Sequence, residues 1–179
     1  ALMGSPIYNG VMRGITLNGI IMLGTTLEGL NGDADDPAPE EKASAQARTL
    51  PGLVVTAAYH GLVSGADNVS DTYASAAEFA KAEYEPALLQ LLKGELGDDE
   101  RTAMAETISG MIGISPEALG DDLYIDERQF AKLVLRASGL EAGMYDSRYT
   151  LPLKNSGFDP VADDPAMGRY VPGFVASFN

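Results

Sequence analysis

The stretch Gly-Ile-Thr-Leu-Asn-Gly-Ile-Ile-Met-Leu, residues 14 to 23, decides the expected fold, because no other stretch has the pattern of a buried β-strand. Its apolar residues do not alternate cleanly with polar ones, and residues 20 to 23 are continuously apolar, which is typical of a strand covered on both faces of a parallel sheet. The remaining residues have the patterns of helices and loops. We therefore expect a mainly α-helical segment with one buried strand, belonging to a larger α/β protein.

The composition is that of an acidic, folded protein. A chain of 179 residues is long enough to bury a core of its own. Its 26 acidic and 12 basic residues give a formal charge of −14, which disfavours nucleic acid and anionic membranes as partners. The absence of cysteine excludes disulfides, thiolate metal ligands and a cysteine nucleophile. We expect no cofactor, and the composition identifies neither a compartment nor an oligomeric state.

The chain divides by pattern into four regions. Residues 1–30 have the features of a piece of an α/β core, with a helix tail, the strand and a turn, and residues 31–49 form an acidic loop and linker. Residues 50–140 are expected to be helical, and residues 141–179 to be an extended segment that returns toward the core. The acidic loop does not match an EF-hand, because Asp36 and Lys42 occupy the positions of the required glycine and glutamate. We expect it to be exposed, mobile and free of metal.

Capping residues and apolar spacing predict the helices of the third region. The helix predicted from Asp71 to Lys93 contains Pro86, which removes a helical hydrogen bond, so we expect a kink or a break there. Its expected apolar face begins at Tyr73, and the last helix is expected to bury Ala137. A possible short hairpin or extended segment follows from residue 141 to 152, and residues 170–179 form a final helix or extended stretch. The predicted helices run from Pro51 to Gly61, from Asp71 to Lys93, from Asp98 to Gly113, from Ser115 through Leu119 and from Asp126 to Gly139.

Three places in the sequence carry candidate functional groups. Gly24, Thr25 and Thr26 follow the carboxyl end of the strand, where open α/β sheets bind ligands. His60, the single histidine, follows Tyr59 at the end of a short helix, where packing or the helix dipole explains it better than a place in a substrate cleft.

The third candidate place is a segment without a clear helix or strand pattern that contains aromatic and charged side chains. Such a segment suits either a binding rim or a structural Asp–Arg pair. That segment contains Tyr145, Asp146, Arg148 and Tyr149. Asn68-Val69-Ser70 matches a glycosylation sequon, and helix capping is the interpretation we favour for it. The chain contains no Gly-x-Ser-x-Gly nucleophile elbow.

Four motifs, in this order, resemble the middle of bacterial serine carboxypeptidases. They are Leu-Pro-Gly-Leu-Val-Val-Thr-Ala-Ala-Tyr-His at 50–60, Ile-Ser-Pro-Glu-Ala-Leu at 114–119, Tyr-Ile-Asp-Glu-Arg-Gln-Phe at 124–130 and Gly-Met-Tyr-Asp-Ser-Arg-Tyr-Thr at 143–150. The resemblance implies an α/β-hydrolase parent whose core is interrupted by a largely helical lid. It also implies that residues 14–23 are the core strand that follows the nucleophile helix.

The resemblance further implies a function. The intact parent would hydrolyse C-terminal peptide bonds through an acyl-enzyme, with its catalytic serine before residue 1 and its aspartate and histidine after residue 179. No catalytic residue is then expected within the chain, and His60 matches a lid position. The residues implied to bind the peptide substrate are Gly24, Thr25, Thr26, Tyr59, His60, Tyr145 and Arg148. The alternative is a stand-alone acidic helical module that binds a protein partner without catalysis.

Overall fold

The computed structural model describes residues 37–63, 68–153 and 163–178. The expected strand at 14–23, the turn at 24–26 and the acidic residues 33–36 lie outside these ranges. The chain divides into two compact units, Ala1–Ala38 and Pro39–Asn179, and the following description concerns the second.

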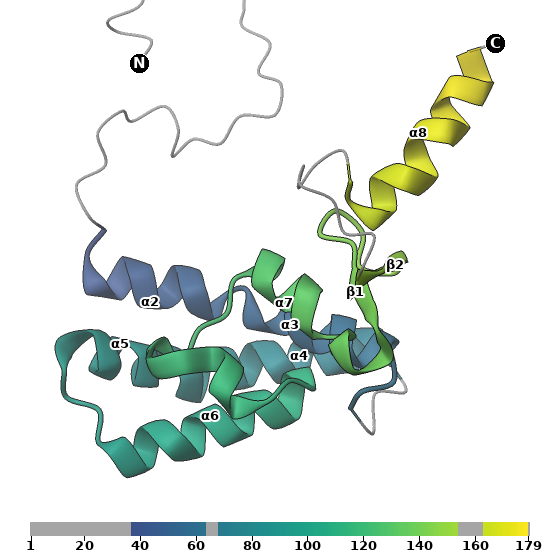
Figure 1. The fold of residues 1–179 in the computed structure, drawn as a ribbon. Helices are drawn as coiled ribbons and strands as arrows, with labels where there is room; N and C mark the ends of the chain where they lie inside the picture. Colours follow the sequence, from purple (N-terminus) through teal and green to yellow (C-terminus); the bar gives the residue numbers. More distant parts are fainter. Residues whose placement is uncertain (1–36, 64–67, 154–162, 179) are drawn as a thin grey trace, which may run out of the picture. The chain divides into compact units, whose positions relative to one another are not determined.

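The described part of the chain is mostly helical, as expected, with one small antiparallel hairpin (Figure 1). Strands β1 and β2 pair with Glu141 opposite Leu151, which confirms the hairpin alternative for the segment after residue 140. The helices and strands are α2 (Pro39–Ala47), α3 (Leu50–Tyr59), α4 (Val69–Phe79), the π-helical turn η2 (Ala80–Tyr84), α5 (Glu85–Lys93), α6 (Asp98–Ile112), the 3-10 helices η3 (Pro116–Asp122) and η4 (Arg136–Ser138), α7 (Glu127–Leu133), β1 (Leu140–Ala142), β2 (Thr150–Pro152) and α8 (Pro165–Phe178).

Helix α2 corrects the expectation of a loop and linker for residues 39–47 of the region 31–49. It begins at Pro39, and its first turn contains Glu40 and Glu41. Proline suits the first helical position, and carboxylates there interact favourably with the helix dipole, so the features interpreted as loop signals also start a helix. Ala43 and Ala47 lie one turn apart and are buried, and α2 packs against α5.

Helices α3 and α4 begin and end close to the predicted residues. Pro51 lies in the first turn of α3, and Gly61, with φ 71°, follows the helix in the left-handed conformation that glycine adopts most readily. The cap of α4 is Asn68, whose Oδ1 accepts a hydrogen bond from the Ser70 amide at 2.9 Å. This confirms the capping role proposed for the Asn68 sequon, whereas the helix predicted to start at Asp71 begins at Val69.

The predicted interruption at Pro86 takes the form of the π-helical turn η2. The amide of Glu85 bonds to the carbonyl of Ala80, five residues earlier, and α5 continues from there. Proline has no amide hydrogen and clashes with the preceding helical turn, and a wider turn accommodates both effects. The line of buried residues on this long helix runs Ala76, Ala80, Tyr84 and Leu88.

Tyr73 and Ala137 were expected to face inward, and both are exposed. Tyr73 keeps 52% of its surface in contact with solvent, because the buried line begins at Ala76, one turn later. Ala137 belongs to η4, where the tighter 3-10 spacing replaces the α-helical spacing used for the prediction. The cap at Asp126 is confirmed, since its Oδ1 accepts a hydrogen bond from the Gln129 amide at 2.8 Å.

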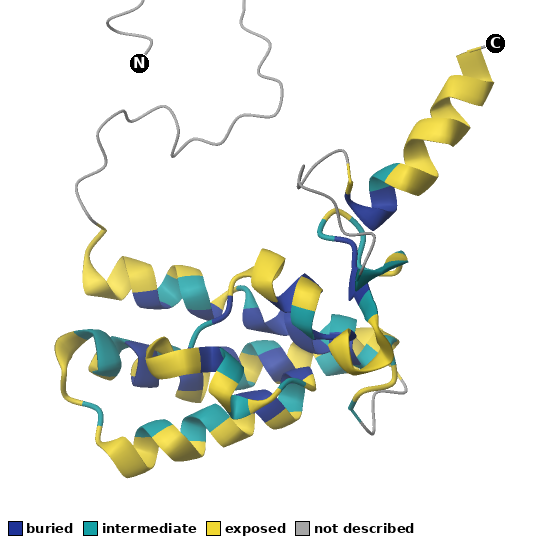
Figure 2. Ribbon diagram, viewed as in Figure 1, coloured by how far each residue is buried: buried dark blue, intermediate teal, exposed yellow. Residues whose placement is uncertain are grey.

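The hydrophobic core lies between the helices of the second unit (Figure 2). One polar contact crosses it, in which the Tyr84 hydroxyl donates to the carbonyl of Leu123 at 2.7 Å. This contact allows a phenol to lie in an apolar core without an unpaired oxygen. The largest fully buried side chains are Leu50, Leu88, Ile108, Ile112 and Leu123.

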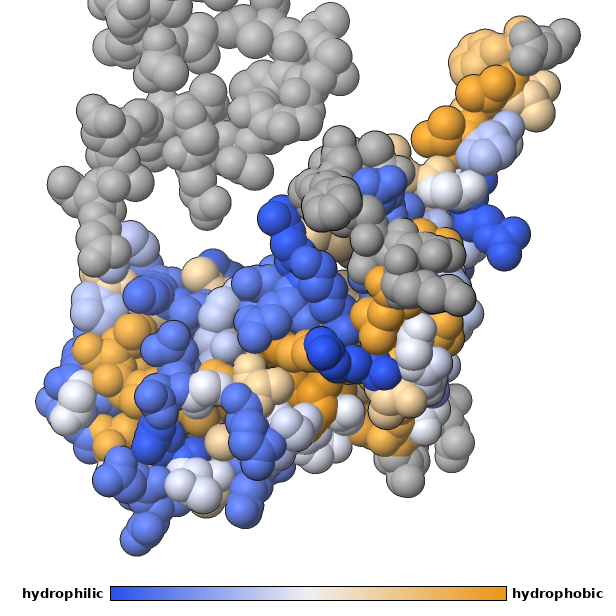
Figure 3. Space-filling view, viewed as in Figure 1, coloured by the Kyte–Doolittle hydropathy of each residue, from blue (hydrophilic) through white to orange (hydrophobic). Residues whose placement is uncertain are grey.

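Helix α8 has a buried start and an exposed, apolar remainder (Figures 2 and 3). Pro165 and Ala166 are buried in its first turn, and residues 170–178 contain no charged side chain. This confirms the helical alternative for the end of the chain. The exposed large apolar residues of α8 are Tyr170, Val171, Phe174, Val175 and Phe178.

Candidate functional site

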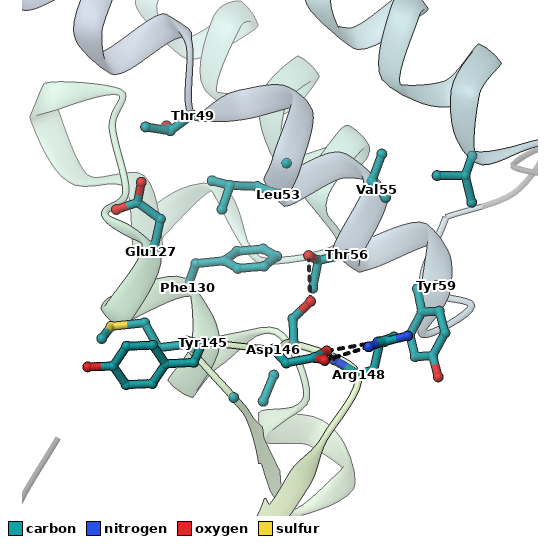
Figure 4. Close-up of a pocket in the computed structure, with 17 residues that line it drawn as sticks. Thr49, Leu53, Val55, Thr56, Tyr59, Glu127, Phe130, Tyr145, Asp146 and Arg148 are labelled. Carbon is teal, nitrogen blue, oxygen red and sulfur yellow. Dashed lines mark hydrogen bonds and ion pairs between the residues drawn. The ribbon is translucent and has the colours of Figure 1, made fainter. Parts of the chain in front are cut away.

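A groove of about 580 Å³ lies between α3, α7 and the loop that joins the two strands of the hairpin (Figure 4). Its volume falls in the range of known ligand sites, about 300 to 1,000 Å³. Leu53 and Phe130 provide apolar side chains inside it, while Tyr59 and Tyr145 stand at its edges with 59% and 54% of their surfaces exposed. The groove therefore offers an apolar interior with an aromatic rim.

One wall of the groove is a face of α3. Leu53, Thr56 and Tyr59 follow one another at intervals of three residues, which places them along one side of a helix. Figure 4 shows them in this order along α3, with Tyr145, Asp146 and Arg148 at the opposite wall. Helix α3 is apolar on several sides, so it contributes to the core and to the groove at the same time.

The opposite wall is the hairpin loop, which is closed by its own backbone. The Gly143 amide bonds to the Tyr149 carbonyl at 2.9 Å, and the Tyr149 amide bonds to the Asp146 carbonyl at 3.1 Å. A Cβ atom on Gly143 would lie 2.5 Å from the Asp146 carbonyl oxygen, closer than a carbon can approach. Glycine is therefore required at residue 143 for the loop to close.

Two contacts tie this loop to α3. The hydroxyl groups of Thr56 and Ser147 lie 3.0 Å apart, and His60 Nε2 lies 2.7 Å from the Ser147 carbonyl oxygen. A carbonyl oxygen only accepts hydrogen bonds, so Nε2 carries the proton and donates. His60 thus holds the groove wall in place from the end of α3, and it does not itself line the groove.

Asp146 is the electrostatic centre of the loop. Its carboxylate accepts two hydrogen bonds from the Arg148 guanidinium, at 2.9 and 2.6 Å, and one from the Tyr170 hydroxyl at 2.7 Å. The bonds from Arg148, followed by that from Tyr170, hold the pKa of Asp146 well below its usual range. The guanidinium, whose side chain is 62% exposed, keeps a raised pKa through the same pair.

Asp164 connects the same loop to the start of α8. Its buried carboxylate accepts hydrogen bonds from the amide of Met144 at 2.6 Å and from the amide of Ala166 at 2.8 Å. The second bond caps the helix, and the first holds the loop of the groove. The expectation of an extended segment from residue 141 onward gave Asp164 no such role, although an aspartate directly before Pro165 is a recognisable helix-start signal.

The structure brings together three of the residues predicted to bind substrate. Tyr59, Tyr145 and Arg148 line one groove, and His60 supports its wall. Gly24, Thr25 and Thr26 lie outside the described residues. Sequence reasoning assigned no site role to Leu53 or Phe130, because their spacing equally fits a core position.

Ser147 and His60 both have other polar partners at the groove wall. The Ser147 hydroxyl is paired with Thr56, while His60 bonds to the backbone carbonyl of Ser147, so this serine and this histidine do not form a nucleophile–base pair. In residues 37–63, 68–153 and 163–178, no three acidic or histidine side chains form a group that could hold a metal ion. No helix in the same ranges is long and apolar enough to span a membrane.

The chain matches no protein-family model, no curated protein and no solved structure.

Proposed function

We propose that this chain is the helical lid segment of a serine carboxypeptidase-like α/β-hydrolase, and that the groove between α3 and the hairpin loop is part of the cleft that binds the peptide substrate. The reaction of the intact parent is hydrolysis of a C-terminal peptide bond through an acyl-enzyme. The chain itself contributes substrate contacts, and the nucleophile, the general base and the oxyanion donors belong to the parent's core.

The observation that carries this proposal is the convergence of Tyr59, Tyr145 and Arg148 on one groove. The resemblance assigns these residues to the substrate cleft. They belong to two motifs, residues 50–60 and 143–150, that lie far apart in the sequence. In a chain unrelated to the resemblance, nothing would require the two motifs to meet. Their meeting is backed by contacts that bridge 91 and 87 residues of sequence, from Thr56 to Ser147 and from His60 to Ser147.

The groove offers suitable chemistry for part of a peptide. Leu53 and Phe130 supply apolar surface for a side chain, and the rings of Tyr59 and Tyr145 can pack against it at the rim. Arg148 supplies exposed N–H donors for peptide carbonyl groups, and its bidentate pairing with Asp146 fixes the direction in which the guanidinium points.

Alanine substitution at the rim of the intact parent tests the proposal. Tyr145→Ala and Arg148→Ala should each raise KM for a blocked dipeptide by about fivefold, the effect of losing roughly 1 kcal/mol of uniform binding. Lys132→Ala is the matched control, because Lys132 is exposed on α7, does not line this groove and lies outside the hairpin loop. If all three variants had the same KM and the same peptide selectivity as the wild type, the groove would not contact substrate.

The alternative, an acidic helical module that binds a protein partner, is favoured by one observation. The uncharged, exposed side of α8 presents Phe174, Val175 and Phe178 to solvent, and a contiguous apolar surface of this kind often marks a protein interface. The coding sequence around this chain discriminates the two functions. A serine elbow encoded upstream favours the hydrolase, and a reading frame without one favours the module.

A further inference from the structure

A second groove, also of about 580 Å³, lies where α2 and the start of α3 face α4 and η2. It shares no lining residue with the groove beside the hairpin loop. Its volume is again in the range of small-molecule sites, about 300 to 1,000 Å³. The substrate cleft proposed above makes no use of it, so the function of this groove is a separate question.

The floor of the second groove is built from small side chains. Ala47, Pro51 and Ala80 are buried beneath it, and Ala77 is half-buried at its side. Such residues leave room between helices that larger side chains would fill. Tyr73, with 52% of its surface exposed, stands at the edge as a free aromatic face. The floor and edge of the groove therefore present small apolar side chains and one aromatic ring.

The charges on the rim are unusual for so acidic a chain. Arg48 and Lys81 both line the groove, and Glu85 is the acidic residue there. Arg48 bonds through Nη1 to the Ser44 hydroxyl at 3.2 Å, and among the described residues neither cation forms an ion pair. The rim therefore has a net positive charge in a chain whose net charge is −14, and it favours an anionic ligand group.

Lys81 lies on the π-helical turn η2, four residues before Glu85. In an α-helix, residues four apart are neighbours, and Lys81 with Glu85 would have the spacing of a surface ion pair. The turn η2, which contains Lys81, is closed by the bond from the Glu85 amide to the Ala80 carbonyl. The described residues contain no ion pair between them. Turns of this type occur frequently at functional sites.

We propose that the second groove is a binding site for an aromatic carboxylate, with the flat ring on the alanine floor beside Tyr73 and the carboxylate between Arg48 and Lys81. A carboxylate matches a guanidinium and an ammonium group by charge and by hydrogen bonding. Glu85 opposes the anion and limits its affinity. The site is independent of the carboxypeptidase function proposed above.

The test uses 2-naphthoate as the probe and its neutral amide, 2-naphthamide, as the comparison. Titration of the isotope-labelled chain should shift the NMR signals of Ala47, Ala77 and Ala80, with a Kd of about 1 mM, typical of a ligand of this size. The double variant Arg48→Gln/Lys81→Gln should weaken naphthoate binding at least tenfold, roughly the effect of losing a charged hydrogen bond. Glu85→Gln should strengthen it.

Two further variants separate the site from general charge effects. Arg128→Gln/Lys132→Gln removes the same charge from α7, outside both grooves, and should leave the Kd unchanged. Ala77→Phe keeps both cations and fills the groove, and it should abolish binding while the circular dichroism spectrum is retained. Equal affinity for naphthoate and naphthamide would overturn the proposal. Naphthoate-induced shifts confined to the signals of Tyr59 and Tyr145 would also overturn it. So would an equal loss of naphthoate binding in Arg48→Gln/Lys81→Gln and Arg128→Gln/Lys132→Gln.

Discussion

The hydroxyl of Tyr170 on α8 donates a hydrogen bond to Oδ2 of Asp146 in the hairpin loop, with 2.7 Å between the two oxygens. The Tyr170 ring also packs edge-on against Tyr149, with 5.6 Å between ring centroids. Together with the bond from the Met144 amide to Asp164, these contacts link α8 to the wall of the candidate peptide groove. The position of Arg148 is therefore set by both the loop and α8.

Asp146→Asn should remove a pH-dependent part of the stability. The pKa of Asp146 is lowered in the folded chain, first by the hydrogen bonds from Arg148 and then by that from Tyr170. A carboxylate with a lower pKa in the folded than in the unfolded chain stabilises the fold at pH values above its unfolded-state pKa, about 4. This stabilisation is lost as the pH falls toward the folded-state pKa. Thermal denaturation should give the largest difference in Tm between wild type and variant near neutral pH, and a shrinking difference below about pH 4.

The charge-matched control for this experiment is Asp122→Asn, because Asp122 is exposed and forms no ion pair within the described ranges. A Tm difference for Asp146→Asn that stayed constant from neutral to acidic pH would mean that the carboxylate charge does not stabilise the loop.

Tyr84→Phe should lower the free energy of unfolding by about 1 to 3 kcal/mol, because it leaves the buried carbonyl of Leu123 without its hydrogen-bond donor. Urea denaturation measures this change, and Tyr73→Phe is the control, since Tyr73 is half-exposed. Similar losses in the two variants would show that the buried bond contributes little.

The same substitution changes the response to alkaline pH. Burial, and to a smaller extent Tyr124, raises the pKa of Tyr84 above its usual value. The Tyr84 hydroxyl therefore loses its proton at about pH 10 in the unfolded chain and keeps it in the folded chain. The contribution of the protonated Tyr84 to stability is present below about pH 10 and is lost as the pH rises above it. Tyr84→Phe should therefore lose less stability than the wild type between neutral pH and values above about 10.

Alanine at Gly113 should be more destabilising than alanine at Gly94. Both glycines end a helix in the left-handed conformation, with φ 70° and 71°, and alanine in that conformation costs about 1 to 2 kcal/mol. A Cβ at Gly113 would also lie 2.8 Å from Cβ of Leu62, whereas at Gly94 it would meet nothing within 4 Å. Chemical denaturation should give an additional loss of about 1 kcal/mol or more for Gly113→Ala. Equal losses would mean that Leu62 moves aside freely.

The helix boundaries could be predicted from sequence because their signals are local. Gly61 and Gly113 adopt positive φ at the predicted ends of α3 and α6, and Asp126 caps α7 through its own side chain. The helix predicted to run from Asp126 to Gly139 is shorter, because α7 ends at Leu133 and Gly139 follows the 3-10 helix η4. Helix α2 could not be separated from a loop by composition, because proline and carboxylates belong to loops and to first helical turns alike.

The groove could be predicted only in part, because it depends on contacts between distant residues. No periodicity indicates that the hydroxyl of Thr56 meets that of Ser147, 91 residues later, or that Asp164 reaches the Met144 amide. The resemblance placed Tyr59, Tyr145 and Arg148 in one cleft, whereas residue types alone left the loop near Asp146 open between a binding rim and a structural ion pair. The described structure contains the ion pair between Arg148 and Asp146, and Arg148 also lines the groove.

Active-site labelling of the protein encoded by the full reading frame tests the proposal that this chain is the lid of a serine carboxypeptidase-like parent. The protein expressed from that frame is treated with a serine-directed phosphonylating reagent, and the labelled residue is identified by peptide mapping. Its activity on a blocked dipeptide is compared with that of residues 1–179 alone. We predict an active parent whose activity is lost on labelling of a serine upstream of residue 1. We predict no detectable activity in the isolated chain, because the proposal assigns the triad and the oxyanion donors to the core of the parent. Hydrolysis by the isolated chain that is lost in His60→Ala, or a label on Ser147, would contradict it.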